Sequence, residues 1–297
     1  MGLILKTNTM KSFVMKNISH IVLIAVAMLA YGCESSELEM ALPKQTTNSI
    51  TIGLPQTKTS LGASENGVRG ILWSSGDCIA VNGEKSSEAG LDAESSSVAT
   101  FDFASELTYP LNILYPASFY KDASTITLPA VQEAAVASFA TNTLPMATRV
   151  TSVGGAVKLG HLAGVIHLQL KAEKGAKPTR NNEVRKIEFS GNDDEQVSGD
   201  FIIDYNTVTL APTSVAKADK TVATRVIGTL TIDAVTDIFV VVPAREYKNG
   251  FTVRIFNSSG NYMDKKKSSG VTIANGEILK MPEMEFSPTG TMLDVEL

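Results

Sequence analysis

Apolar and polar residues alternate along most of the chain, in short runs separated by turn-forming residues. Near the start of this pattern, Ile50, Ile52 and Leu54 alternate with Thr51 and Gly53, which is the period of a half-buried strand. Similar runs recur at Val68–Trp73, Cys78–Val81, Val98–Phe103, Leu111–Tyr115, Leu162–Leu170, Val184–Phe189, Phe201–Tyr205, Thr207–Leu210, Asp237–Val242, Phe251–Phe256 and Val271–Ile273. No amphipathic segment of about 10–15 residues separates them, so the pattern predicts an all-β chain built from sandwiches.

Glycine-containing pairs between these runs supply the turns of a β-rich fold. They include Asn82-Gly83, Ser190-Gly191, Asn249-Gly250, Ser259-Gly260 and Asn275-Gly276. One interval differs: in Val131–Phe139, apolar residues fall at helical spacing in an alanine-rich context, and Pro129 could begin a helix there. The interval is short, so a surface turn or an irregular crossover is an equally good interpretation.

The N-terminal segment has the pattern of a signal peptide. Lys11 and Lys16 precede an apolar run, Ile21–Tyr31, that is shorter than the roughly 20 residues of a membrane-spanning helix. Small residues then lead into Cys33, as in a bacterial lipobox, where the cysteine is acylated and becomes the new N-terminus. Ala30 stands where a lipobox more often has leucine, so cleavage as an ordinary secreted protein stays open. Acyl chains contribute about 0.8 kcal/mol per buried CH₂, so the predicted anchor is permanent.

The residues after the cysteine indicate where the protein is held. Glu34–Glu39 is rich in acidic residues and resembles a surface-export signal of Gram-negative lipoproteins, although a solvated linker would look the same. We therefore predict attachment to the outer membrane, on its outward-facing side.

Length and charge bound the remaining possibilities. Removal of the signal peptide leaves about 265 residues, which favours two domains over one. The net charge of −5 provides no basic stripe and argues against nucleic acid as a partner. The predicted organisation is a signal peptide (residues 1–32), an acidic lipid-anchored tether (33–47), an N-terminal β-sandwich (48–157) and a C-terminal β-sandwich with a tail (158–297).

The sequence offers little chemistry for an enzyme. It has none of the common nucleophile, phosphate-binding or paired-cysteine motifs. His161 and His167 would lie about 20 Å apart along one strand, too far to share a metal ion. Asn192–Glu195 gathers oxygen ligands but is interpreted as a solvated hairpin tip. Lys265–Lys267 is interpreted as an exposed hairpin face, with a sugar-phosphate or partner contact as the alternative, and Cys78 in an apolar strand as a core residue. We predict no catalytic residue, metal site or cofactor.

Several phrases in order along the chain resemble the fimbrillin family of Gram-negative type V pili, which includes many lipoproteins. They are Lys58-Thr59-Ser60-Leu61, Trp73-Ser74-Ser75-Gly76-Asp77, Ile79-Ala80-Val81-Asn82-Gly83, Tyr115-Pro116, Leu128-Pro129-Ala130-Val131-Gln132, Pro145-Met146-Ala147, Val242-Pro243 and Gly250-Phe251. The resemblance implies two transthyretin-like β-sandwich domains, export as a lipoprotein, and assembly into, or at the tip of, a surface fimbria. The implied partners are other pilin subunits or further copies of this chain, a host or bacterial surface receptor, and the membrane through the lipid anchor.

In filaments of this family, a protease removes a first strand and a neighbouring subunit's strand fills the groove. The resemblance makes Ile50, Ile52 and Leu54 the candidate displaced strand. Lys44, Lys58 and Arg69 flank this strand, and Arg69 fits an arginine-directed protease best, with cleavage after a lysine as the alternative. The period-2 tail makes Leu293, Val295 and Leu297 the candidate donor strand. The alternative for the tail is that it closes the second domain or stays loose.

A surface glycan-binding lipoprotein is the alternative function. It would need exposed, coplanar aromatic side chains and no donor strand, so the exposure of Trp73, Tyr109, Tyr115 and Tyr120 distinguishes the two hypotheses. A lone tryptophan beside apolar strands favours a core position.

Overall fold

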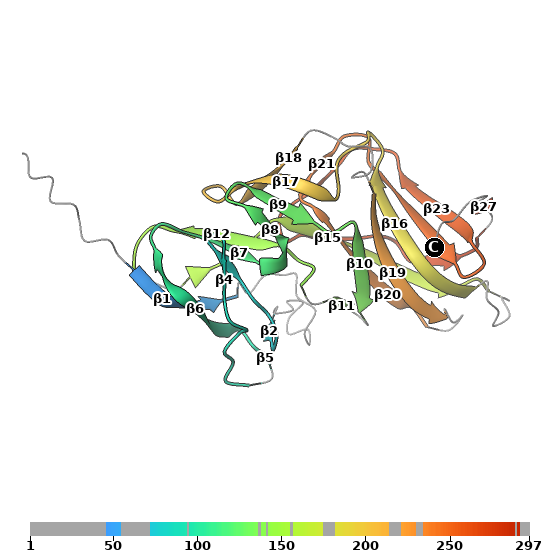
Figure 1. The fold of residues 1–297 in the computed structure, drawn as a ribbon. Coiled ribbons are helices and arrows are strands. Elements are labelled where there is room, and N and C mark those ends of the chain that lie inside the picture. The colour runs from blue at the N-terminus through green and yellow to red at the C-terminus, as the bar shows by residue number, and fades with distance from the viewer. Residues whose placement is uncertain are drawn as a thin grey trace, which may run out of the picture. The chain divides into compact units, whose positions relative to one another are not determined.

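The computed structural model shows a chain of short strands (Figure 1). It describes residues 46–54, 72–93, 95–135, 138–140, 142–154, 157–174, 182–213, 221–229, 234–288 and 290–291. These residues all belong to one compact unit, Lys44–Leu297. They include no α-helix, and a complete 3₁₀ turn is formed by Ala117–Phe119. The predicted all-β sandwich fold is therefore confirmed, and in the described residues no helix is long and apolar enough to cross a membrane.

Two facing sheets enclose the first core. The smaller has the order β13-β1-β6 and consists of β1 (Thr46–Gly53), β6 (Val98–Thr108) and β13 (Val157–Lys158). The larger has the order β14-β12-β7-β3-β4 and consists of β3 (Ala80–Val81), β4 (Glu84–Lys85), β7 (Leu111–Tyr115), β12 (Met146–Val150) and β14 (Gly160–His161). A short pair, β2 (Trp73–Ser74) and β5 (Ser95–Ser96), carries the tryptophan into this core.

The five-stranded sheet is buried on both faces. Successive residues of β7 point to opposite sides, so Ile113 and Tyr115 belong to the first core and Leu114 to a second. The second core is closed by a sheet of order β18-β17-β9-β8, made of β8 (Tyr120–Asp122), β9 (Thr125–Leu128), β17 (Gly199–Asp204) and β18 (Thr209–Pro212). This layer combines strands from both sides of residue 158, and the domain boundary near that residue stays a prediction.

A further sandwich holds the largest apolar cluster. One sheet has the order β11-β10-β19-β16-β22-β23-β27 and consists of β10 (Val131–Ala135), β11 (Ser138–Phe139), β16 (Glu183–Gly191), β19 (Thr221–Thr229), β22 (Phe251–Asn257), β23 (Asn261–Lys267) and β27 (Gly290–Thr291) (Figure 1). The other is formed by β15 (Ala163–Ala172), β20 (Thr236–Pro243), β25 (Ile278–Lys280) and β26 (Met284–Phe286). A two-stranded sheet of β21 (Arg245–Tyr247) and β24 (Val271–Ile273) completes the described fold. Phe189, Phe251 and Tyr247 pack together in this core.

The helix considered for Val131–Phe139 is wrong. Its described residues form β10 and β11, and Val131 to Glu133 pair in parallel with Ala223 to Arg225 of β19. The helical spacing was local, whereas the backbone hydrogen bonds are supplied by a strand about 90 residues away in sequence, so tertiary pairing outweighs the alanine-rich propensity.

Candidate functional site

β1 is the central strand of its sheet. It pairs antiparallel with β6 from Thr46 to Gly53, with one irregularity between Thr47 and Ser49. On its other side, Ile52 and Gly53 pair in parallel with β13. We call the space between β6 and β13 that this strand occupies the β1 slot. An occupant of the β1 slot is thus held by backbone hydrogen bonds from two directions.

The side chains of β1 follow the predicted alternation. Ile50, Ile52 and Leu54 are 5%, 0% and 7% exposed and enter the first core. Thr51 is exposed, and its hydroxyl lies 3.0 Å from that of Thr100 on β6. Fully burying an aliphatic side chain contributes about 1.5–3 kcal/mol, so three such positions make the empty β1 slot costly.

Trp73 closes the inner wall of the β1 slot. Its side chain is 1% exposed, and its indole Nε1 donates a hydrogen bond of 3.2 Å to the backbone carbonyl of Ile52. Its ring meets Phe101 and Tyr115 edge to face, with ring centroids 5.0 Å apart in both cases. The prediction that Trp73 is a core residue is therefore confirmed.

The turn after Trp73 is organised by a buried carboxylate. Asp77 accepts hydrogen bonds of 2.8 Å from the backbone N–H of Ser74 and from the hydroxyl of Tyr115. Burial raises the pKa of Asp77, and these two hydrogen bonds oppose that shift. Burial also raises the pKa of the Tyr115 phenol, and the neighbouring Asp77 carboxylate raises it further. The link between Asp77 and Tyr115 is visible only in the fold.

A second turn ties the end of β6 to the start of β7. Asn82 has a left-handed backbone conformation, with φ of 49°. Its amide Nδ2 donates to the carbonyls of Thr108 and Pro110, and its Oδ1 accepts from the backbone N–H of Asn112. Gly83 follows with φ of 92°, and a Cβ there would lie 2.6 Å from the Tyr120 hydroxyl. The predicted Asn82-Gly83 turn thus has both a conformational and a packing reason.

The four aromatic residues that distinguish the two functional hypotheses do not form an exposed platform. Trp73 and Tyr115 are buried and cross at 89°. Tyr109 is half-buried against the first core, and Tyr120 is half-buried against the second. The four rings therefore pack against two separate cores and do not form one flat surface.

The remaining predicted site residues lie outside the described residues. They are Cys33, Arg69, Leu293, Val295 and Leu297. Lipidation, cleavage and strand donation therefore stay predictions.

The two histidines lie in different sheets, contrary to the expectation of one strand face. His161 is buried in β14, whereas His167 is on β15 and contacts Asp237 at 2.7 Å. The backbone changes sheets near Leu162, so a single alternating strand does not connect the two histidines. Among the described residues, no group of three or more acidic, histidine or cysteine side chains is arranged to hold a metal ion.

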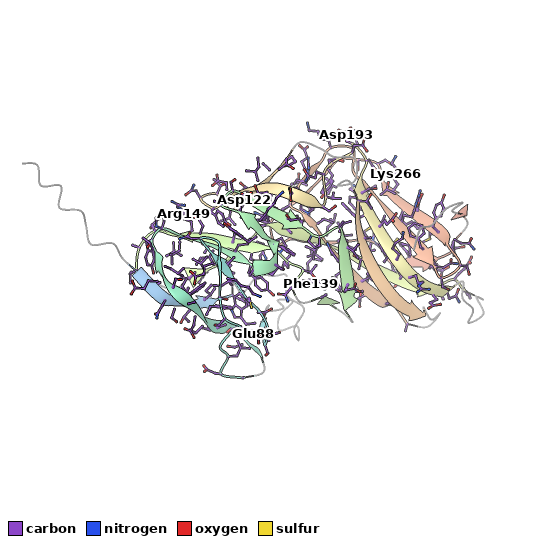
Figure 2. The ribbon with its side chains drawn as sticks, in the orientation of Figure 1. Glu88, Asp122, Phe139, Arg149, Asp193 and Lys266 are labelled. Atoms are coloured by element: carbon purple, nitrogen blue, oxygen red, sulfur yellow. The ribbon has the colours of Figure 1, made fainter. Side chains whose placement is uncertain are left out.

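The two charged segments differ in exposure. Asp193 and, on β23, Lys266 are exposed (Figure 2). Glu195 is buried, with 8% of it exposed, so the expectation of a solvated tip is wrong for that residue. Asn192 has a structural role: its amide donates to the carbonyls of Asn249 and Lys267 and accepts from Thr252. These contacts join neighbouring strand ends.

Comparison with known proteins supports the fold. No family model matches the sequence, and no curated protein matches it. A crystal structure described as a candidate cell adhesion protein from Bacteroides ovatus aligns with a TM-score of 0.51 at 12% identity, over 84% of this chain and 95% of that chain. A candidate cell adhesion protein from Bacteroides uniformis aligns with a TM-score of 0.47 at 12% identity, over 80% and 93%. A fimbrial protein from Bacteroides ovatus aligns with a TM-score of 0.36 at 9% identity, over 80% and 50%. Only the first similarity is strong enough to indicate a shared fold.

Proposed function

We propose that this chain is a surface-exposed lipoprotein and a structural or adhesive subunit of a type V pilus that assembles by strand exchange. The observation that carries the proposal is the position of β1: a central strand with three apolar side chains directed into one core. The fold shared with a protein described as a cell adhesion candidate supports a surface role. Partners are further subunits or copies, and the lipid on Cys33 holds the uncleaved chain at the outer membrane until cleavage after Arg69 removes it.

The tail has the spacing that the β1 slot requires. Aligned with β1, it places three apolar residues at the three buried positions, Leu293 at Ile50, Val295 at Ile52 and Leu297 at Leu54. Val295 is one methylene smaller than Ile52, a difference worth about 1 kcal/mol, which the slot tolerates.

The polar residues of the tail also fit this alignment. Asp294 would replace the exposed Thr51, and Glu296 would replace Gly53. A Cβ at Gly53 meets nothing within 4 Å, and Gly53 does not have a positive φ, so a larger residue fits there. A shift of one residue would bury both carboxylates, which is strongly unfavourable.

The test compares a triple replacement of the apolar residues of the tail with a double replacement of its acidic residues. Changing Leu293, Val295 and Leu297 to Ser should leave an exported monomer and abolish filaments, seen by electron microscopy of the producing cells. Changing Asp294 and Glu296 to Ser is the matched control and should retain filaments. Filaments at wild-type level from the first variant would reject the donor role of the tail.

Cleavage is tested separately. Subunits purified from filaments should begin at Gly70 on N-terminal sequencing, because the proposal places cleavage after Arg69. Filament subunits that retain residues 46–54 would reject displacement of β1.

The glycan-binding alternative is less well supported. Its aromatic platform would need Trp73 and Tyr115 at the surface, and both are buried. Two results together would favour that alternative. The soluble Cys33→Ser chain would bind to a glycan array, and cells that lack this protein would still grow normal filaments.

A further inference from the structure

Trp73 contacts the backbone of the strand in the β1 slot, and this contact does not depend on that strand's side chains. The indole N–H can only donate, and its acceptor is the carbonyl of Ile52. Any strand that enters in the same direction and register offers a carbonyl at that position. A shift of one residue would turn that carbonyl toward the opposite neighbour and turn the apolar side chains outward.

Trp73 is held in place by a closed set of contacts. Its ring packs edge to face with Phe101 of β6 and with Tyr115 of β7. The Tyr115 hydroxyl donates to Asp77, and Asp77 accepts the N–H of Ser74, the residue that follows Trp73. The chain around Trp73 and the ring that supports it are therefore tied to one carboxylate.

The three side chains that make up this set of contacts are buried. Trp73, Asp77 and Tyr115 are 1%, 3% and 7% exposed. A buried indole N–H without an acceptor costs about 1–3 kcal/mol. The occupant's carbonyl removes that cost, so Trp73 favours a strand in the register of β1 over an empty or shifted one.

We infer that Trp73 is a specificity-determining residue of the β1 slot, recognising the backbone carbonyl of the occupying strand, and that Asp77 and Tyr115 position it. The inference rests on the proposed strand exchange. The occupant of the β1 slot is then a strand with apolar residues at three alternating positions. It lies antiparallel to β6, and the backbone carbonyl of its central apolar residue accepts the hydrogen bond from the Trp73 indole.

The test uses the full chain after limited digestion with an arginine-specific protease, with cleavage after Arg69 and loss of the fragment that contains β1 both verified by mass spectrometry. The probe is a fluorescently labelled peptide of residues 290–297, and its dissociation constant is measured by anisotropy. A second peptide has an ester in place of the amide after Val295, which weakens that carbonyl as an acceptor. A third has the ester after Leu293 as a matched control.

Comparing these peptides on wild type and on Trp73→Phe gives a double-mutant cycle. We expect the ester after Val295 to weaken binding to wild type about fivefold more than binding to Trp73→Phe, since a neutral hydrogen bond contributes about 1 kcal/mol. The ester after Leu293 should weaken binding equally to both. Tyr115→Phe should reduce the Val295 effect and leave the Leu293 effect unchanged, which a general loss of stability would not do.

The outcomes separate this inference from the proposed function. Equal effects of the Val295 ester on wild type and Trp73→Phe, with tight binding of the parent peptide, would overturn the role of Trp73 and leave strand exchange standing. Absence of parent-peptide binding to the cleaved chain would overturn both. Trp73 is the chain's one tryptophan, so its emission independently reports whether the indole becomes exposed on cleavage and buried again on binding.

Discussion

The side-chain amide of Gln132 hydrogen-bonds both backbone groups of Val241. Its Nε2 donates to the Val241 carbonyl at 2.6 Å, and its Oε1 accepts from the Val241 N–H at 3.0 Å. Gln132 is 7% exposed. The side chain of Gln132 on β10 thus pairs with the backbone of β20 as a neighbouring strand would. Val241 is 109 positions away from Gln132 in the sequence.

This relationship predicts a large effect of Gln132 on stability. Gln132→Ala should lower the free energy of unfolding by about 2 kcal/mol or more, because two buried backbone groups lose their partner. Gln132→Glu keeps the acceptor and removes only the donor to the Val241 carbonyl, so it should also destabilise. Urea denaturation measures both, and Lys266→Ala, at an exposed position of β23 in the same sheet as β10, is the control, with an expected change within about 0.5 kcal/mol. An Ala variant as stable as wild type would contradict the role of this amide.

The buried face of β1 should contribute far more stability than its exposed face. Ile52→Ala should cost about 2–5 kcal/mol, since the side chain is completely buried beside Trp73. Thr51→Ala, on the opposite face of the same strand, should cost less than about 1 kcal/mol. Thermal or urea unfolding of the uncleaved chain measures both. Similar losses for the two variants would mean that β1 is not packed as described.

His161 should make the protein sensitive to mild acid. Burial lowers the pKa of His161 from 6.5 to about 4, so between these values the unfolded chain binds a proton that the folded chain does not. The free energy of unfolding therefore falls as the pH falls through that window, by about 2 kcal/mol between pH 7 and 4.5.

Urea denaturation of His161→Leu and His161→Gln at both pH values tests this dependence. Each variant should lose less stability than wild type on acidification, and titration of the carboxylates, Asp77 included, should largely cancel between the proteins. An identical loss in wild type and in both variants would show that His161 does not titrate in this way.

Cys33 should determine where the protein is found before cleavage after Arg69. Cys33→Ser should release the protein from the membrane fraction, because each acyl CH₂ contributes about 0.8 kcal/mol to anchoring and the variant has no thiol to acylate. Fractionation and intact mass spectrometry measure the change. Cys78→Ser, which removes the chain's other cysteine, is the control and should stay membrane-bound. Wild-type protein of unmodified mass, beginning after another residue, would contradict lipidation.

Much of the secondary structure was predictable from the alternation of apolar and polar residues. The runs Leu111–Tyr115 and Val271–Ile273 were predicted with the bounds that the structure has, and Ile50, Ile52 and Leu54 were correctly placed on one buried face. Alternation with period 2 fixes which side of a strand is apolar, and this is a local property of the sequence. The turn at Asn82-Gly83 is local in the same sense.

Pairing between distant segments was not predictable. Only the tertiary structure placed β1 between β6 and β13, joined Tyr115 to Asp77, gave Val131–Ala135 a strand partner in β19 and set Gln132 against Val241. The alternation of apolar and polar residues indicates which face of a strand is buried, but it does not indicate which strand lies beside it. Strands pair through backbone N–H and C=O groups, and these are the same in nearly every residue. The choice of partner depends on how all the apolar faces are buried together, so the sequence alone determined the strands and the tertiary structure decided the site.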